Sequence, residues 1–193
     1  NTSCDPVNPN GQFTASVGGT TTGYTFRWFR GTDDTGTALD AANISGSAGE
    51  VATKLSAGDY ALKVISNTTG CVTITPLSIV DDKVLPIVTT AVTDNSVCDA
   101  TVGSASYTGR IVATVSYRGV TVTDLSNYTF TWYAGAAATG TPVATGKNLH
   151  TLENQNGGTY TLIVTNDAVS CPSNPVYPVI KNVSVPPVVT VVK

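Results

Sequence analysis

The chain contains no methionine and one histidine, and charged residues make up 12% of its 193 residues, about half the share usual in soluble domains. Lysine and arginine total 10 and aspartate and glutamate total 13, so the net charge of −3 provides no basic surface for phosphate. No apolar run approaches the roughly 18 residues that a membrane-spanning helix needs. The longest apolar-rich stretch, residues 185–192, holds two prolines. We therefore expect neither a nucleic-acid partner nor a membrane span.

Threonine and valine are abundant instead, with 32 and 26 residues. Their branched side chains suit a pleated sheet and lose rotamer freedom in a helix. Eighteen glycines and ten prolines interrupt the chain, and no ten-residue segment has the 3.6-residue period of a helix. The hydrophobic share of 41% is enough for packed cores, so we expect an ordered all-β protein.

The sequence consists of two copies of one unit. The segment 24–28, YTFRW, recurs as YTFTW at 128–132, and 58–71 recurs at 158–171. Cys4 recurs as Cys98, and the segment that begins at Pro86 recurs at Pro187. We therefore predict repeats at 1–85 and 86–187, with 188–193 as the start of a further repeat or a linker. The joint near 83–86 has a proline with β-branched neighbours and no Gly/Ser linker, which indicates a stiff, extended connection.

Each unit shows several short segments in which apolar and polar residues alternate, as strands with one buried face do. The expected strands are 13–17, 24–28, 60–64 and 72–79 in the first unit, and 111–115, 128–132 and 160–164 in the second. Pro76 predicts a bulge or an edge strand. Six or seven strands in roughly 100 residues predict an immunoglobulin-like sandwich of two antiparallel sheets. We expect two such domains end to end, with core markers at Trp28, Tyr60, Trp132 and Tyr160.

Four cysteines allow three pairings. The repeat favours Cys4–Cys71 and Cys98–Cys171, because each unit then closes itself in the same way. Each bond would stabilise its unit by up to about 4 kcal/mol in the chain-entropy model. The second cysteine lies eleven residues after the core tyrosine, so the bond should clamp an edge or an end of the sandwich. Free buried thiols and a metal site are the alternatives, although a zinc site lacks further ligands at workable spacing. Disulfides imply export to an oxidising compartment.

No group of residues forms a recognisable catalytic set, and we predict no catalytic residue. His150 has no nucleophile motif nearby and no counterpart in the first unit. Glu50 and Glu153 are the two glutamates, and nothing pairs them as glycoside hydrolysis requires. The acidic doublets are 33–34 and 81–82. Asp81 and Asp82 are weak calcium candidates at the unit boundary, where a solvated turn is the alternative; no other cofactor is expected.

Several aromatic residues fall outside the expected core positions. Phe29 and Tyr133 follow the core tryptophans and should point to the opposite sheet face, while Tyr107, Tyr117 and Tyr177 have no partner in the first unit. Exposed rings of this kind stack on sugars, but they also cover sheet edges. A glycan-binding module attached to a secreted protein is therefore the alternative function.

Both units show the same order of cysteine, glycine and aromatic positions. In the first unit the matching residues are Cys4, Gly18, Gly19, Tyr24, Phe26, Trp28, Ala57, Gly58, Tyr60, Val64, Gly70 and Cys71. In the second they are Cys98, Tyr128, Trp132, Gly158, Tyr160, Val164 and Cys171. The second unit departs by lacking Gly-Gly before Tyr128 and by having Ser170 before Cys171.

This order of residues resembles the SprB-type repeats of gliding Bacteroidota. The resemblance implies a segment of a very large surface adhesin, carried by the gliding machinery and exported by the type IX system. We accordingly expect a non-catalytic, extracellular, monomeric segment that acts as a stiff spacer and supports attachment to surfaces. Its expected partners are neighbouring repeats of the same chain, the gliding machinery and external surface polysaccharide.

Overall fold

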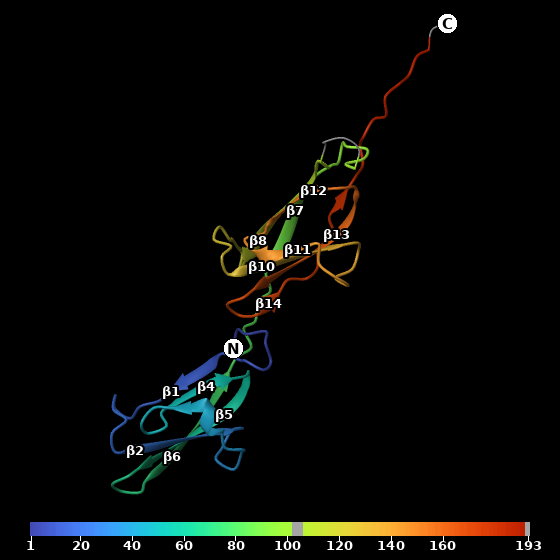
Figure 1. Cartoon of the computed structure of the whole chain (residues 1–193). Coiled ribbons are helices and arrows are strands. Elements are labelled where there is room, and N and C mark those ends of the chain that lie inside the picture. The colour runs from blue at the N-terminus through green and yellow to red at the C-terminus, as the bar shows by residue number, and fades with distance from the viewer. Residues whose placement is uncertain (102–105, 192–193) are drawn as a thin grey trace. The chain divides into compact units, whose positions relative to one another are not determined.

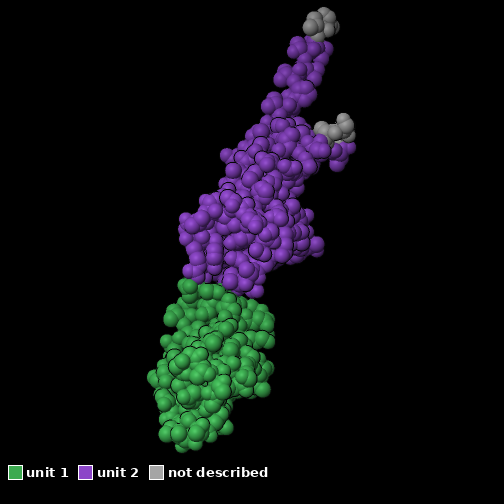
Figure 2. All heavy atoms as spheres, turned by 90° about the vertical axis from the view of Figure 1, so that its left-hand side faces the viewer, with its two compact units in different colours: residues 1–83 green, residues 84–193 purple. Residues whose placement is uncertain are grey.

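The structure is a computed structural model that describes residues 1–101 and 106–191. The chain folds into two compact units, Asn1–Lys83 and Val84–Lys193, which Figure 2 distinguishes by colour. Both units consist of antiparallel strands (Figure 1). Within residues 1–101 and 106–191, no helix is long and apolar enough to cross a membrane.

Unit 1 is a sandwich of two three-stranded sheets. One sheet has the order β1-β4-β3 and the other β2-β5-β6, and a single 3₁₀ turn, η1, precedes β3. The strands are β1 (Gly11–Thr14), β2 (Tyr24–Arg30), β3 (Ile44–Ser45), β4 (Val51–Leu55), β5 (Gly58–Ser66) and β6 (Val72–Ile79), with η1 at Ala41–Asn43. Pro76 lies on β6, the end strand of its sheet, opposite Ala61. This confirms the predicted edge position, where a proline removes no ladder hydrogen bond from the sheet interior.

Unit 2 repeats this arrangement with one additional long strand. Its first sheet has the order β12-β8-β7, with β9 paired to β8, and its second has β11-β10-β13-β14, with β15 paired to β13. The strands are β7 (Ile87–Thr93), β8 (Gly109–Tyr117), β9 (Val120–Thr121), β10 (Tyr128–Ala134), β11 (Ala144–Lys147), β12 (Thr151–Gln155), β13 (Gly158–Asn166), β14 (Cys171–Pro172) and β15 (Val179–Ile180).

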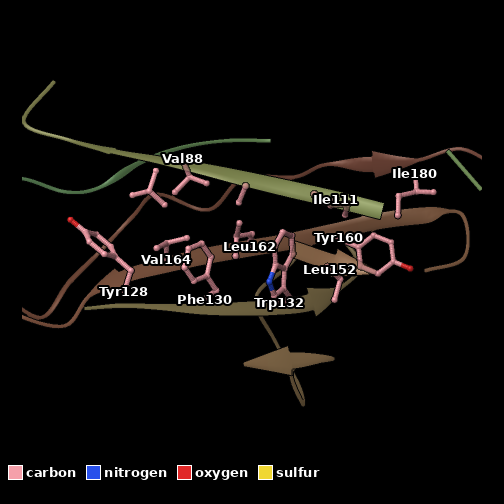
Figure 3. Close-up of a cluster of buried hydrophobic side chains, with 12 residues drawn as sticks. Val88, Ile111, Tyr128, Phe130, Trp132, Leu152, Tyr160, Leu162, Val164 and Ile180 are labelled. Atoms are coloured by element: carbon pink, nitrogen blue, oxygen red, sulfur yellow. The ribbon is translucent and has the colours of Figure 1, made fainter. Parts of the chain in front are cut away.

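The core of each unit lies between its two sheets, because alternate residues of every long strand face inward. In unit 1 the buried cluster is Phe26, Trp28, Ala52, Leu55, Tyr60 and Leu62. In unit 2 it is larger, and Figure 3 shows Phe130, Trp132 and Leu162 at its centre. The four predicted core markers are all at least 93% buried: Trp28, Tyr60, Trp132 and Tyr160.

The tryptophans and tyrosines are anchored alike in the two units. The indole Nε1 of Trp28 donates to the carbonyl of Gly49 at 2.8 Å, and that of Trp132 donates to the carbonyl of Leu149 at 3.0 Å. The hydroxyl of Tyr60 donates to the carbonyl four residues upstream, at Ser56, over 2.8 Å. The two packed antiparallel sheets, the central tryptophan and this tyrosine corner together define tandem immunoglobulin-like β-sandwiches.

Candidate functional site

The predicted disulfides Cys4–Cys71 and Cys98–Cys171 are wrong. Cys71 and Cys98 are free, exposed thiols, whereas Cys4 and Cys171 are disulfide-bonded. Each unit therefore has one bonded and one free cysteine.

The strand geometry of unit 1 explains why Cys4 cannot reach Cys71. The amino group and carbonyl of Asn1 bond to the Val80 carbonyl (2.8 Å) and the Asp82 amide (2.9 Å), beyond the last residue of β6. Cys71 instead precedes the first residue of that eight-residue strand, and eight residues of strand span about 25 Å. A disulfide requires Cα atoms within about 7 Å. Three residues of chain after Asn1 cover only about 11 Å.

Unit 2 separates its cysteines in the same way. Asn95, three residues before Cys98, bonds to Asn156 and Asn182 near the Gly158 end of β13. Cys171 pairs with Asn166 at the opposite end of that nine-residue strand. The two cysteines of a unit thus lie at opposite ends of the sandwich. The eleven-residue spacing between tyrosine and cysteine was the sequence signal for this, because it exceeds the length of one strand.

Sequence analysis overlooked a buried asparagine that closes one end of unit 2. Asn95 is fully buried. Its Nδ2 donates to the Val97 carbonyl at 2.8 Å and to Asn182 Oδ1 at 2.8 Å, and its Oδ1 accepts from the Thr108 amide at 3.1 Å. Asn1 occupies the equivalent place in unit 1, where its Oδ1 accepts from two backbone amides, those of Ser3 and Asn10. Both asparagines precede the first cysteine by three residues, a shared spacing that the sequence displays.

The acidic doublets form local pairs. Asp81 Oδ2 lies 3.2 Å from Lys83 Nζ, and the amide of Asp82 donates to the Asn1 carbonyl. Asp34 Oδ2 lies 2.8 Å from Lys63 Nζ. Across residues 1–101 and 106–191, no group of three or more His, Cys, Asp or Glu side chains gathers as a metal site would require.

Four aspartates have pKa values below their usual range because local hydrogen bonds favour the charged carboxylate. The Thr35 hydroxyl and amide lower the pKa of Asp33, and the Thr101 hydroxyl and amide do the same for Asp99. Asn8 lowers the pKa of Asp5 and the Ser126 amide that of Asp124. These are turn caps.

His150 lies on the surface. Its Nδ1 is 3.0 Å from the carbonyl oxygen of Asn148, and its ring meets Phe130 edge to face at 6.4 Å between centroids. Glu50 Oε2 accepts from the Ala48 amide at 3.0 Å, while Glu153 Oε1 is 3.2 Å from Arg110 Nε. These side chains stabilise turns and strand edges.

Two tyrosines of unit 2 lie in one row on the outer face of a sheet. Tyr133 pairs with Thr161 across β10 and β13, and the neighbouring pair Trp132 and Leu162 faces the core. Val176 pairs with Leu162 on the other side of β13, so Tyr177 stands opposite Thr161. Tyr133 and Tyr177 therefore flank Thr161 about 10 Å apart, two strand spacings. Tyr177 is 53% exposed.

The other aromatic candidates lie elsewhere. Tyr117 is half-buried at the end of β8, where its ring receives the guanidinium of Arg118 at 5.8 Å. Phe29 pairs with Ala61, which pairs in turn with Pro76, so unit 1 has one ring in the corresponding row. Tyr107 is half-buried in the segment before β8. Burial raises the pKa of the Tyr160 phenol and, together with the charge of Tyr117, that of Tyr128.

Comparisons with known proteins find likeness among solved structures only: no family model and no curated protein matches the chain. The three N-terminal domains of the bacteriophage RB49 highly immunogenic outer capsid protein (Hoc) align with a TM-score of 0.47 and 17% identity, over 90% of this chain and 55% of that one. Immunoglobulin domains 1–5 of Sidekick-1 align with a TM-score of 0.31 and 17% identity, over 92% and 38%. The N-terminal four immunoglobulin domains of Dscam1 isoform 8.4 give 0.29 and 13%, over 91% and 41%. The chain thus spans between 38% and 55% of the length of these structures.

Proposed function

We propose that the chain is a non-catalytic structural and adhesive segment of a large exported cell-surface protein, of the kind that SprB-type repeats build in gliding adhesins. The observation that carries this proposal is what the two units have in common. They share the anchored tryptophan, the tyrosine corner and the capping asparagine. In contrast, His150 occurs only in unit 2, and both acidic doublets occur only in unit 1. The repeat therefore preserves a scaffold.

The chemistry of the chain fits an extracellular place. Cys4 and Cys171 are disulfide-bonded, and structural disulfides persist in oxidising compartments. The same proposal includes export by the type IX system and a stiff joint near residues 83–86. Its partners are neighbouring repeats and the gliding machinery. It requires no cofactor.

The test is surface exposure on the organism that makes the protein. Antibodies raised against the chain should label intact, non-permeabilised cells, and the added chain should compete with those cells for attachment to glass or polysaccharide. An antibody against a cytoplasmic protein serves as the control for intactness. Labelling that requires permeabilisation would refute the proposal.

The row of Tyr133, Thr161 and Tyr177 favours a second function, the binding of extended polysaccharide. Two aromatic rings about 10 Å apart, two strand spacings, give an extended polysaccharide two stacking places on this sheet. Thr161 is fully buried and its hydroxyl donates to the Gly135 carbonyl at 2.7 Å. This bond holds the middle of the row in place.

Calorimetric titration with soluble hexose oligosaccharides of six units, both α- and β-linked, tests this second function. If the row binds the oligosaccharide, Tyr177→Ala should weaken binding at least tenfold, because stacking of the tyrosine rings on sugars supplies most of the contact. Tyr117→Ala, on the other sheet, is the matched control and should leave affinity unchanged. Absence of heat with every oligosaccharide would rule out this role for the row.

A further inference from the structure

Two residues, Asn156 and Gly157, connect β12 to β13. When glycine follows asparagine, the glycine nitrogen can attack the asparagine side chain with little hindrance, because glycine has no Cβ. The chain has one other such pair, Asn10 and Gly11. The two pairs have the same local sequence and different surroundings, so a difference in their reactivity reports the effect of the fold.

The side chain of Asn156 is folded back onto the amide of Gly157. This amide donates to Asn156 Oδ1 at 2.7 Å. Since a C=O bond is about 1.2 Å long, the Gly157 nitrogen lies within about 4 Å of Asn156 Cγ. Reacting atoms in well-oriented sites lie about 3–3.5 Å apart. A small rotation of the side-chain amide therefore presents Cγ to the nitrogen.

A buried donor acts on the oxygen of the same side chain. Asn95 is fully buried, and its Nδ2 donates to Asn156 Oδ1 at 3.3 Å. A second bond from this Nδ2, to Asn182 Oδ1 at 2.8 Å, fixes its position. Attack on Cγ places negative charge on Oδ1. A fixed donor stabilises such charge, as in an oxyanion hole, where one donor changes the rate by about a hundredfold.

Hydrogen bonds of the Gly157 amide act in the opposite direction. This amide must lose its proton before it attacks, and it donates to Asn182 Oδ1 at 3.0 Å as well as to Asn156 Oδ1. A neutral hydrogen bond retains a proton by about fivefold. The two bonds together slow the reaction less than the positioned donor accelerates it. Asn156 is exposed, so hydroxide and water reach the site.

The other pair is held in an unreactive arrangement. Asn10 Oδ1 accepts from the amides of Thr2 and Ser3 at 2.8 and 3.2 Å, and Asn10 Nδ2 donates to the Thr2 hydroxyl at 2.8 Å. Gly11 is buried and pairs with Leu55 of β4. Cyclisation at Asn10 must first break these contacts, so the fold protects this pair.

We propose that Asn156 and Gly157 form a self-modifying site that converts Asn156 to aspartate and isoaspartate in the folded chain. Hydroxide removes the Gly157 amide proton, and the nitrogen forms a bond to Asn156 Cγ. The bond from Cγ to Nδ2 breaks, and Nδ2 takes a proton from water and leaves as ammonia. Water then opens the cyclic imide. Opening at Cγ gives aspartate, and opening at the backbone carbonyl gives isoaspartate.

Isoaspartate alters the turn more than aspartate does, because the backbone then runs through Cγ and gains one methylene. The Asn156 carbonyl, which accepts from the Tyr160 hydroxyl at 3.0 Å, becomes a free carboxylate. In unit 1 the equivalent acceptor belongs to Ser56, and serine cannot cyclise in this way. The modification therefore loosens one end of unit 2 and leaves unit 1 unchanged.

Peptide mapping by mass spectrometry tests the site in the native chain, incubated at 37 °C and pH 8.5. Asn156 should gain about one mass unit at least tenfold faster than Asn10. In urea with a reductant, both pairs lose their surroundings, so their rates should become equal and Asn156 should react more slowly than in the native chain. Equal rates at the two pairs in the native chain, or a faster reaction of Asn156 in urea, would overturn the proposal.

The stability of the incubated protein gives the second arm. On a Trp28→Phe background, incubation should lower the urea midpoint reported by Trp132, whereas on a Trp132→Phe background the Trp28 midpoint should not move. Asn156→Gln is the matched control. It keeps the amide but would have to form a larger ring, so its midpoint should be stable to incubation. Asn156→Asp adds the charge without the methylene and should lower the midpoint less than incubation does. An unchanged Trp132 midpoint after full conversion of Asn156 would refute the effect on the turn.

Discussion

At the scale of single residues, a tyrosine hydroxyl fixes the entry to a nine-residue strand in each unit, β5 in unit 1 and β13 in unit 2. Tyr160 is 7% exposed, and its hydroxyl donates to the Asn156 carbonyl at 3.0 Å. Tyr160→Phe removes this bond and leaves the carbonyl without its protein donor. We expect unit 2 to lose about 1 kcal/mol of unfolding free energy. Urea denaturation followed by Trp132 fluorescence measures the loss. Tyr177→Phe, at an exposed ring, is the control, and an equal effect of both changes would contradict the role of the corner.

The cysteines differ in chemical state, which gives a second prediction at this scale. Native protein treated with iodoacetamide without reductant should be modified at Cys71 and Cys98, which are free and exposed, while Cys4 and Cys171 resist until a reductant is added. Peptide mapping by mass spectrometry identifies the modified residues. Recovery of a peptide pair joining Cys4 to Cys71 would disprove the assignment.

At the scale of strands, the start of β8 depends on a close approach between backbones. A Cβ at Gly109 would overlap the Gln155 carbonyl and the Ile180 side chain. Gly109→Ala must therefore displace β12 at its irregular pairing with β8, and we expect a cost of about 2 kcal/mol, as for other overpacked sites. Gly146→Ala is the matched control, because its added Cβ comes no nearer than 4.0 Å to a neighbour. Thermal unfolding of both variants should show a lower melting temperature for Gly109→Ala alone.

The strands also show which parts of the fold are predictable from sequence. Strands β2, β5, β10 and β13 are predictable because alternating large side chains mark the buried face. Strand β12 is not, since Thr151–Gln155 contains one apolar residue, Leu152. In β4 the alternation is broken at Lys54, which has a left-handed φ of 56°. A short or bulged strand is determined by the partner across the sheet, which the local sequence does not contain.

The candidate sites were less predictable than the strands for the same reason. The cysteine pairing depends on hydrogen bonds from Asn1 to Val80 and Asp82, about eighty residues away in sequence. These bonds place Cys4 at the end of unit 1 remote from Cys71. Repetition correctly identified the equivalent cysteines, but it does not indicate at which end of a sandwich each lies. The row of Tyr133 and Tyr177 likewise depends on the pairing of Val176 with Leu162.

At the scale of the whole molecule, the two units have cores of unequal size. Six residues form the buried cluster of unit 1, and twelve form that of unit 2. Because burial of apolar surface is the main stabilising contribution, unit 1 should be the less stable unit.

This difference predicts unfolding in two steps, and each unit has one tryptophan to report it. Trp132→Phe leaves Trp28 as the reporter of unit 1, and Trp28→Phe leaves Trp132 as the reporter of unit 2; both indoles are at least 97% buried. In urea with a reductant present, and at low protein concentration, the Trp28 signal should change at a lower midpoint than the Trp132 signal. Each substitution weakens only its own unit, so the compared reporters lie in unaltered cores. Coincident midpoints would mean that the larger core gives unit 2 no advantage, and that residues 1–83 are stabilised by something other than their own buried side chains.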